Sequence, residues 1–185
     1  SENFFYMCFG KVPKKEIVKA FDVSLILYAE HGFNASTFTA RTITSSLSDI
    51  HGAITGAIAS LKGSLHGGAN EEVMHMLKKI KNPENAEKWI LDSLEKKKLI
   101  MGFGHRVYSK GDSRVPTMKK YYLKVAELLK EKNLPKMSQI IEDIMLEKKN
   151  IHPNVDYTTG PTYHMMGFDT DFFTPIFVIS RITGW

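Results

Sequence analysis

Two histidines of this sequence lie directly beside glycines, each in a segment between helical patterns. His66 lies in residues 63–70 (GSLHGGAN), and His105 lies in residues 101–108 (MGFGHRVY). Glycine permits positive φ angles and lets the backbone approach a ligand closely, so the neighbouring imidazole can be aimed at a reacting atom. Asp156 adds a carboxylate in a third segment of this kind (HPNVDY). We expect these segments to hold the chemistry, because imidazoles and carboxylates transfer protons near neutral pH.

Other chemistries lack their motifs in this chain. Residues 102–107 begin like a dinucleotide fingerprint, but Val107 occupies the third glycine position and no strand precedes the segment. A Walker A loop, a Gly-x-Ser-x-Gly elbow and HExxH spacing are absent, and the single cysteine excludes a multi-cysteine zinc site, so we predict no metal. The remaining candidates are His31, His66, His105, Arg114, Asp156 and Arg181.

Each of these candidates also has a structural interpretation. A loop histidine is usually a hydrogen-bonded structural residue, Arg114 stands where an exposed helix start is expected, and Asp156 suits the cap of a turn at residues 157–160. The residue types alone leave both interpretations open.

The composition is that of a globular protein able to bury a core. The chain has 185 residues, 43% hydrophobic and 24% charged, enough for one domain or a domain with a smaller companion. No apolar run approaches the ~18 residues of a membrane span, so we predict no membrane insertion. The net charge of +5 favours acidic partners, and without a basic stripe interleaved with aromatics we expect small polyanionic ligands and not nucleic acid.

Helical periodicity runs through almost the whole sequence, and the fold class that it predicts is all-α. Apolar residues recur at three- and four-residue steps in residues 14–28, 49–61, 83–94, 121–129, 140–145 and 174–182. Asn82 is expected to cap the helix that begins at Pro83, and Pro135 is expected to separate the fourth helix from the fifth. Residues 49–61 are rich in glycine, alanine and serine, which predicts a buried helix in a tight core or at a subunit interface.

Five segments resemble motifs of the citrate synthase family, in the order in which that family has them. They are residues 30–36 (EHGFNAS), 64–71 (SLHGGANE), 102–108 with 112–114 (GFGHRVY and DSR), 153–156 (PNVD) and 179–181 (ISR). Within the family, residues 111–118 (GDSRVPTM) and 163–167 (YHMMG) are most similar to the 2-methylcitrate synthases. Many citrate synthases have proline where Ser113 stands, a departure that bears on subtype and not on family.

The resemblance implies an all-helical acyltransferase that joins the α-carbon of an acyl-CoA to oxaloacetate and then hydrolyses the thioester. It implies that Asp156 is the base, that His66 stabilises the enol or enolate, and that His105 polarises the ketone. The expected oxaloacetate-binding residues are His31, His105, Arg114 and Arg181. The expected residues for CoA, a co-substrate and not a permanently bound cofactor, are Ile100, Met101, Gly102, Phe103, Gly104, Lys110 and Asn154.

The resemblance also implies three parts of the chain. Residues 1–66 and 161–185 would belong to a large helical domain and residues 67–160 to a small one, with hinges near Gly67 and near a turn at residues 158–160. Family members are roughly twice as long, so we expect a partial chain that lacks an N-terminal part and a C-terminal tail. That tail normally supplies an arginine to the partner subunit's site, and the intact enzyme is expected to be a homodimer.

Three functions stay open from the sequence. The first is 2-methylcitrate synthesis from propionyl-CoA, the second is citrate synthesis from acetyl-CoA, and the third is an inactive helical fragment. The two acyl groups differ by one methyl group, which is worth only ~1–3 kcal/mol in a pocket. One cysteine fits a reducing compartment, and we expect the bacterial cytoplasm, with the mitochondrial matrix as the alternative.

Overall fold

The computed structural model describes residues 1–105, 107, 108 and 110–185, so Arg106 of the third motif lies outside the described residues. The described part of the chain is built from α-helices and one short 3₁₀ helix, with an isolated β-bridge between Phe103 and Pro153, and the all-α prediction is confirmed. The elements are α1 (Glu2–Phe9), α2 (Lys15–Ala29), α3 (Ala35–Ser45), α4 (Ile50–Leu61), α5 (Ala69–Ile80), α6 (Pro83–Glu95), α7 (Val115–Leu129), α8 (Asn133–Lys149), α9 (Val155–Met165), η1 (Thr170–Phe172) and α10 (Phe173–Arg181).

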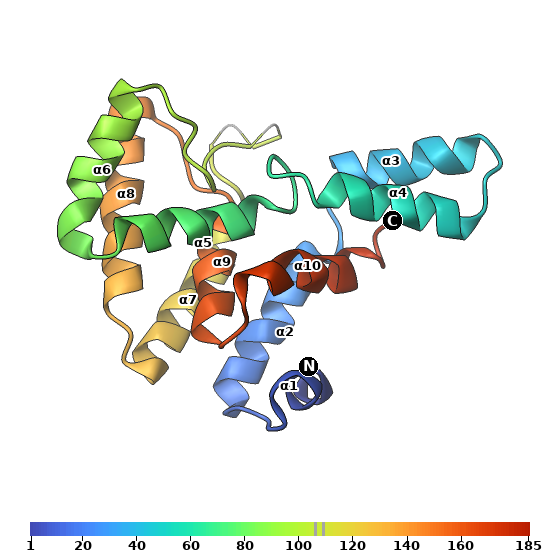
Figure 1. Cartoon of the computed structure of the whole chain (residues 1–185), viewed down its shortest axis with the longest axis horizontal. Helices are drawn as coiled ribbons and strands as arrows, with labels where there is room; N and C mark the ends of the chain where they lie inside the picture. Colours follow the sequence, from blue (N-terminus) through green and yellow to red (C-terminus); the bar gives the residue numbers. More distant parts are fainter. Residues whose placement is uncertain (106, 109) are drawn as a thin grey trace.

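The helices form a broad group from which one hairpin projects (Figure 1). In the group, α5 and α7 pack against α9, α6 packs against α8, and α2 packs against both α7 and α10. The hairpin of α3 and α4 extends to the other side and is joined to the group through the segment before α3 and the segment between α4 and α5. The segments that carry the motifs meet where the hairpin joins the group.

Aromatic side chains fill the core beneath α1 and α2. The ring of Phe21 lies 5.2 Å from that of Phe5 and 5.6 Å from that of Phe168, between ring centroids. Helix α1 was not predicted, since eight residues are too few for a clear period. Burial of Phe5 holds it in place, and Gly10 ends it in the left-handed conformation with φ 67°.

The predicted turn at residues 158–160 is wrong, because α9 runs without a break through Met165 and includes Pro161. A Gly-Pro pair usually ends a helix, but here nearly every residue of α9 is buried. A Cβ atom on Gly160 would lie 2.5 Å from the backbone oxygen of Asn70, so glycine lets α5 and α9 approach closely. The expected domain boundary at residue 160 therefore falls inside a continuous helix.

One expected helix boundary and one expected capping hydrogen bond also need correction. Pro135 does not separate two helices, because α7 ends at Leu129 and Pro135 lies in the first turn of α8, where a missing N–H costs little. Asn82 stands at the N-cap position of α6, but its side chain makes no capping hydrogen bond. Pro83 occupies the start of α6 as predicted.

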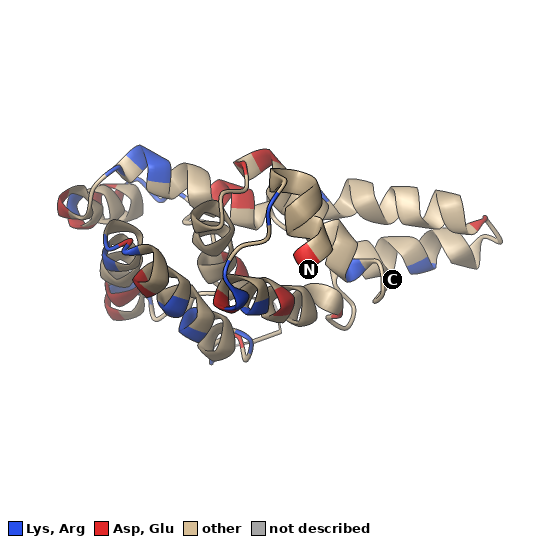
Figure 2. Cartoon of the chain, turned by 90° about the horizontal axis from the view of Figure 1, so that it is seen from below, with Lys and Arg blue, Asp and Glu red and all other residues tan. Residues whose placement is uncertain are grey.

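The α3–α4 hairpin is closely packed inside and apolar outside. A Cβ atom on Gly56 would lie 2.2 Å from the side chain of Ile43, which explains the small residues of α4. The expected burial of α4 holds for only one face, because Ile50 is 70% exposed on the other. Figure 2 shows acidic and basic residues on most helices but very few along this hairpin.

Candidate active site

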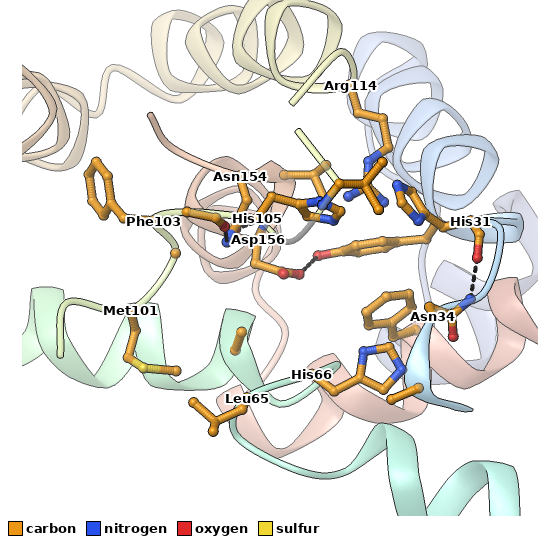
Figure 3. Close-up of a pocket in the computed structure, with 18 of the residues that line it drawn as sticks. His31, Asn34, Leu65, His66, Met101, Phe103, His105, Arg114, Asn154 and Asp156 are labelled. Carbon is orange, nitrogen blue, oxygen red and sulfur yellow. Dashed lines mark hydrogen bonds between the residues drawn. The ribbon is translucent and has the colours of Figure 1, made fainter. Parts of the chain in front are cut away.

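A cavity of about 500 Å³ lies where α2, α9 and α10 meet the segments that follow α4 and α6. All six residues that the sequence singles out for chemistry line it: His31, His66, His105, Arg114, Asp156 and Arg181. The close-up in Figure 3 shows the side chains of His66, His105 and Asp156 reaching the same space from different elements. The folded chain thus brings together residues that are far apart in the sequence.

Asp156 lies in the first turn of α9, two residues after the capping residue Asn154. Its Oδ1 accepts a hydrogen bond of 2.5 Å from the hydroxyl of Tyr28 (Figure 3). Burial raises the pKa of Asp156 to about 6, against the opposing effects of the Tyr28 hydrogen bond and the Arg114 charge. A carboxylate with such a pKa is ionised at neutral pH and is a stronger base than an exposed aspartate.

His66 is held as a neutral hydrogen-bond donor. Its Nε2 accepts a hydrogen bond of 3.2 Å from the backbone N–H of Ser36, so the ring proton belongs on Nδ1. Burial, followed by the nearby charges of Arg181 and His31, lowers the pKa of His66 to about 4. A neutral imidazole beside the cavity can donate its Nδ1–H hydrogen bond to an oxygen that gains negative charge.

His105 has the opposite tautomer for a similar reason. Its Nδ1 accepts the backbone N–H groups of Val107 at 3.0 Å and Tyr108 at 3.3 Å, which leaves the proton on Nε2. Burial and then the charge of Arg114 lower the pKa of His105, so the ring is neutral at neutral pH. Positive φ angles occur beside His105, at Gly102 (81°) and Gly104 (80°), but not at Gly67 and Gly68 beside His66.

Arg114 is fixed by a carboxylate that the sequence reading did not assign a role. Asp112 accepts Nε of Arg114 at 3.0 Å on Oδ1 and Nη2 at 2.8 Å on Oδ2. The same Oδ2 accepts the backbone N–H of Val155 at 3.0 Å, so buried Asp112 joins Arg114 to the start of α9. The Asp-x-Arg spacing just before a predicted helix is the signal that could have revealed this pair.

Arg181 is a buried cation with capacity left for a ligand. Its Nε donates to the backbone oxygen of Tyr28 at 2.5 Å, and its guanidinium lies 4.9 Å from the ring centroid of Phe177. Among the residues that the structure describes, Nη1 finds no hydrogen-bond partner although it is buried. Burial, followed by the Arg114 charge, lowers the pKa of Arg181 to about 10, so it remains charged at neutral pH. A buried, partly unpaired guanidinium is suited to a carboxylate.

The predicted CoA-binding residues divide between two locations. Ile100, Met101, Gly102, Phe103, Gly104 and Asn154 line the cavity, whereas Lys110 is exposed and lies outside its lining. Asn154 makes two hydrogen bonds within the chain. Its Oδ1 accepts the N–H of Asp156 at 3.1 Å, and its Nδ2 donates to the backbone oxygen of Gly104 at 3.0 Å. It therefore holds the segment of His105 against the helix of Asp156.

Sequence reasoning missed the polar roles of Tyr28 and Ser36. Tyr28 was expected only on the apolar face of a helix, yet its hydroxyl contacts Asp156. Ser36, which belongs to a recognised motif, contacts His66 through both its N–H and its hydroxyl. A buried tyrosine hydroxyl normally has a hydrogen-bond partner, which was the available signal for Tyr28.

The described residues form neither a cluster of metal ligands nor a membrane-spanning helix. In the described ranges, no three side chains of histidine, cysteine, aspartate or glutamate gather as metal ligands would. No helix among those residues combines the length and the apolar character needed to cross a bilayer.

The cavity combines neutral imidazoles, two guanidinium groups and the weakly acidic carboxyl group of Asp156. This set is suited to proton transfer on a ligand that carries carboxylates.

Comparison with known proteins agrees with this fold and cavity. The profile described as "Citrate synthase, C-terminal domain" matches residues 1–185. The chain is 55% identical to a 2-methylcitrate synthase of Mycobacterium tuberculosis and 52% identical to a citrate synthase of Mycolicibacterium smegmatis, over its whole length. It covers 47% and 49% of those proteins, so the chain spans about half the length of the curated relatives it matches.

The fold is shared with solved citrate synthases. A ternary complex of the Thermoplasma acidophilum citrate synthase with carboxymethyl coenzyme A and oxaloacetate matches with a TM-score of 0.88 and 39% identity, covering 100% of this chain and 50% of that one. A citrate synthase of Pyrobaculum aerophilum matches with a TM-score of 0.89 and 37% identity, covering 100% and 47%. The helical fold, the ordered motifs and the profile together define one family. The chain belongs to the citrate synthase family.

Proposed function

We propose that this chain carries the active-site half of an enzyme that condenses propionyl-CoA with oxaloacetate, giving 2-methylcitrate and CoA after thioester hydrolysis. The observation that carries the proposal is the cavity in which two neutral imidazoles and the Asp156 carboxyl group face buried guanidinium groups. The 55% identity to a 2-methylcitrate synthase supports the choice of acyl group. The bacterial relatives support the bacterial cytoplasm as its location.

The first step is removal of an α-proton from the acyl thioester by Asp156. The proton moves to the carboxylate while the electron pair of the C–H bond moves toward the thioester oxygen. His66, protonated on Nδ1, donates a hydrogen bond to that oxygen and limits its negative charge. A neutral donor matches this task better than a cation would, because the ring keeps its proton through the step.

The second step forms the new carbon–carbon bond. The α-carbon attacks the ketone carbon of oxaloacetate, and the ketone oxygen takes the Nε2 proton of His105 to become the product's hydroxyl group. Asp156 then releases its proton to solvent and His105 regains one from solvent, which restores both groups. Arg114 and Arg181 hold the two carboxylates of oxaloacetate, with His31 beside them. Water then cleaves the thioester, which releases CoA as the thiol and leaves a third carboxylate on the product.

The assay that tests this function uses the protein in its natural full length. Thiol release is followed with oxaloacetate and either propionyl-CoA or acetyl-CoA, and we expect the larger kcat/KM for propionyl-CoA. A strong preference for acetyl-CoA would instead favour a citrate synthase, an alternative supported by the 52% identity to a protein of that name. If neither thioester reacts, calorimetry with oxaloacetate decides whether a binding fragment remains.

The Tyr28→Phe variant is expected to move the acid side of the pH–activity profile to higher pH. Activity falls as Asp156 becomes protonated, near its pKa of about 6. The Tyr28 hydrogen bond stabilises the charged carboxylate, so its loss raises the pKa of Asp156 and activity is lost at a higher pH. The measurement is kcat/KM between pH 5 and 9, with Tyr122→Phe as control, since that buried hydroxyl bonds Ser138 instead. An unchanged acid limb would contradict the assignment of Asp156 as base.

We also propose that two copies pair through the α3–α4 hairpin. Its outer face carries exposed Phe38, Ile50 and Ile58 and almost no charge (Figure 2). Large apolar side chains exposed on an almost uncharged face are typical of a subunit interface. Placing a lysine at Ile50 is expected to halve the mass measured by light scattering, whereas Leu123→Lys, at an exposed site on α7, leaves it unchanged. A dimer that survives the Ile50→Lys change would point to another interface.

Closure of residues 67–160 over the substrates remains part of the proposal. Gly67 lies in the connection between α4 and α5, where a hinge was expected. The second expected hinge has no turn to use, because α9 is continuous there. Any rotation at that end would have to use the segment before α9 or the one after Met165.

A further inference from the structure

The side chain of Tyr108 touches both of the histidines expected to face oxaloacetate but does not itself line the main cavity. Its ring centroid lies 5.5 Å from that of His31, nearly perpendicular to it, and 4.7 Å from that of His105. The two histidine rings lie 4.9 Å apart (Figure 3). Tyr108 instead borders a second hollow, which His31 and Arg114 also line. It can therefore influence a ligand in the main cavity only through its neighbours.

Hydrogen bonds link Tyr108 to His31 and to Ser113. The Tyr108 hydroxyl lies 3.3 Å from Nε2 of His31, and the hydroxyl of Ser113 donates to it at 3.2 Å. A phenol oxygen that already accepts one hydrogen bond has its own hydrogen free to donate. The arrangement that satisfies all three groups runs from the Ser113 hydroxyl to the Tyr108 hydroxyl and then to Nε2 of His31.

We infer that Tyr108, oriented by Ser113, is a positioning residue that holds His31 in the tautomer with its proton on Nδ1. Among the described residues, the His31 ring has only this one hydrogen-bond partner, so its Nδ1–H remains available for a ligand. His105 receives a matching constraint from the Tyr108 backbone, whose N–H donates to its Nδ1. Tyr108 thus acts on two adjacent imidazoles, on His31 through its hydroxyl and on His105 through its main chain, where the N–H of Val107 donates to the same Nδ1.

The role of His31 as a ligand donor rests on the proposed function, whereas the tautomer does not. Both hydrogen bonds are long, so we expect effects of a few fold and not of orders of magnitude. If His31 binds oxaloacetate, loss of its orientation weakens substrate binding and leaves the chemical step nearly unchanged. The expected signature is therefore a change in KM for oxaloacetate with little change in kcat.

The first test is ¹⁵N NMR of the histidine side chains in the natural full-length protein without substrate. The His31 signals are those that vanish in a His31→Gln sample. We expect the Nδ1–H tautomer in the unaltered protein and a mixture of both tautomers in Tyr108→Phe. An Nε2–H tautomer in the unaltered protein, or no change in Tyr108→Phe, would overturn the inference. This readout needs no activity, so it separates failure of the inference from failure of the proposed function.

Kinetics provides the second test. Tyr108→Phe is expected to raise KM for oxaloacetate about three- to tenfold with kcat changed less than about twofold, which matches loss of one neutral hydrogen bond. Ser113→Ala removes only an exposed hydroxyl and is expected to raise KM for oxaloacetate by a smaller factor. It replaces Tyr108→Phe as the test variant if Tyr108→Phe does not fold. Tyr6→Phe, on an exposed face of α1, is the control. A fall in kcat at constant KM would contradict the positioning role.

Discussion

Asp156→Asn is expected to lower kcat by about 10²–10⁴-fold while KM for oxaloacetate changes little. An amide has nearly the shape of the carboxylate but cannot accept the α-proton, and positioned acid–base groups contribute about this factor in rate. In the proposed function the guanidinium groups, and not Asp156, hold oxaloacetate, so its binding should survive the change. The measurement is steady-state thiol release by the full-length protein under saturating substrates.

A control variant and a second measurement show whether the loss of turnover in Asp156→Asn comes from loss of the base. Asp171→Asn alters an exposed aspartate of η1, outside the cavity lining, and should leave turnover unchanged. Exchange of the α-protons of the acyl-CoA with deuterated water should also be lost in Asp156→Asn, because that exchange reports proton removal without condensation. Normal turnover in Asp156→Asn would show that another group is the base.

Arg114→Ala is expected to weaken oxaloacetate binding by about ten- to a hundredfold. The loss of hydrogen bonds to a charged group costs about 1.5–3 kcal/mol, which corresponds to this range in Kd. The same change leaves the buried Asp112 carboxylate without its cation, so the free energy of unfolding should fall as well. Calorimetry with oxaloacetate measures the first effect, and thermal unfolding measures the second.

The two effects can be separated by removing both charges. In the double variant with Asp112→Asn and Arg114→Ala, neither position is left with an unpaired buried charge, so stability should recover in part while oxaloacetate binding stays weak. Arg41→Ala, on the exposed face of α3, controls for loss of a positive charge and should bind normally. Binding that recovers in the double variant would mean that Arg114 acts through stability alone.

Prediction from sequence worked where a local pattern carries its own physical cause. The regular spacing of Ile17, Val18, Phe21 and Leu25 describes an apolar stripe, and this stripe is part of helix α2. Pro83 begins α6 because proline is tolerated where the N–H has no helical partner. Elements of this kind need no knowledge of the rest of the chain.

Prediction failed where packing overrides local preference. Helix α3 (Ala35–Ser45) is rich in serine and threonine, which favour caps and turns, yet it forms because Asn34 caps it and α4 packs against it. Helix α9 contains Gly160 and Pro161 and forms because its side chains are buried and α5 approaches Gly160 closely. Neither contact can be read from the residues of the helix itself.

The sequence by itself determined the residue types of the cavity, since His66, His105 and Asp156 stand in ordered motifs that exist before folding. Only the tertiary structure decided their chemical state. The proton on Nδ1 of His66 follows from the Ser36 N–H, and the raised pKa of Asp156 follows from burial beside Tyr28. The reason is that protonation depends on solvent exclusion and hydrogen bonds within a few ångströms, supplied by residues that are distant along the chain.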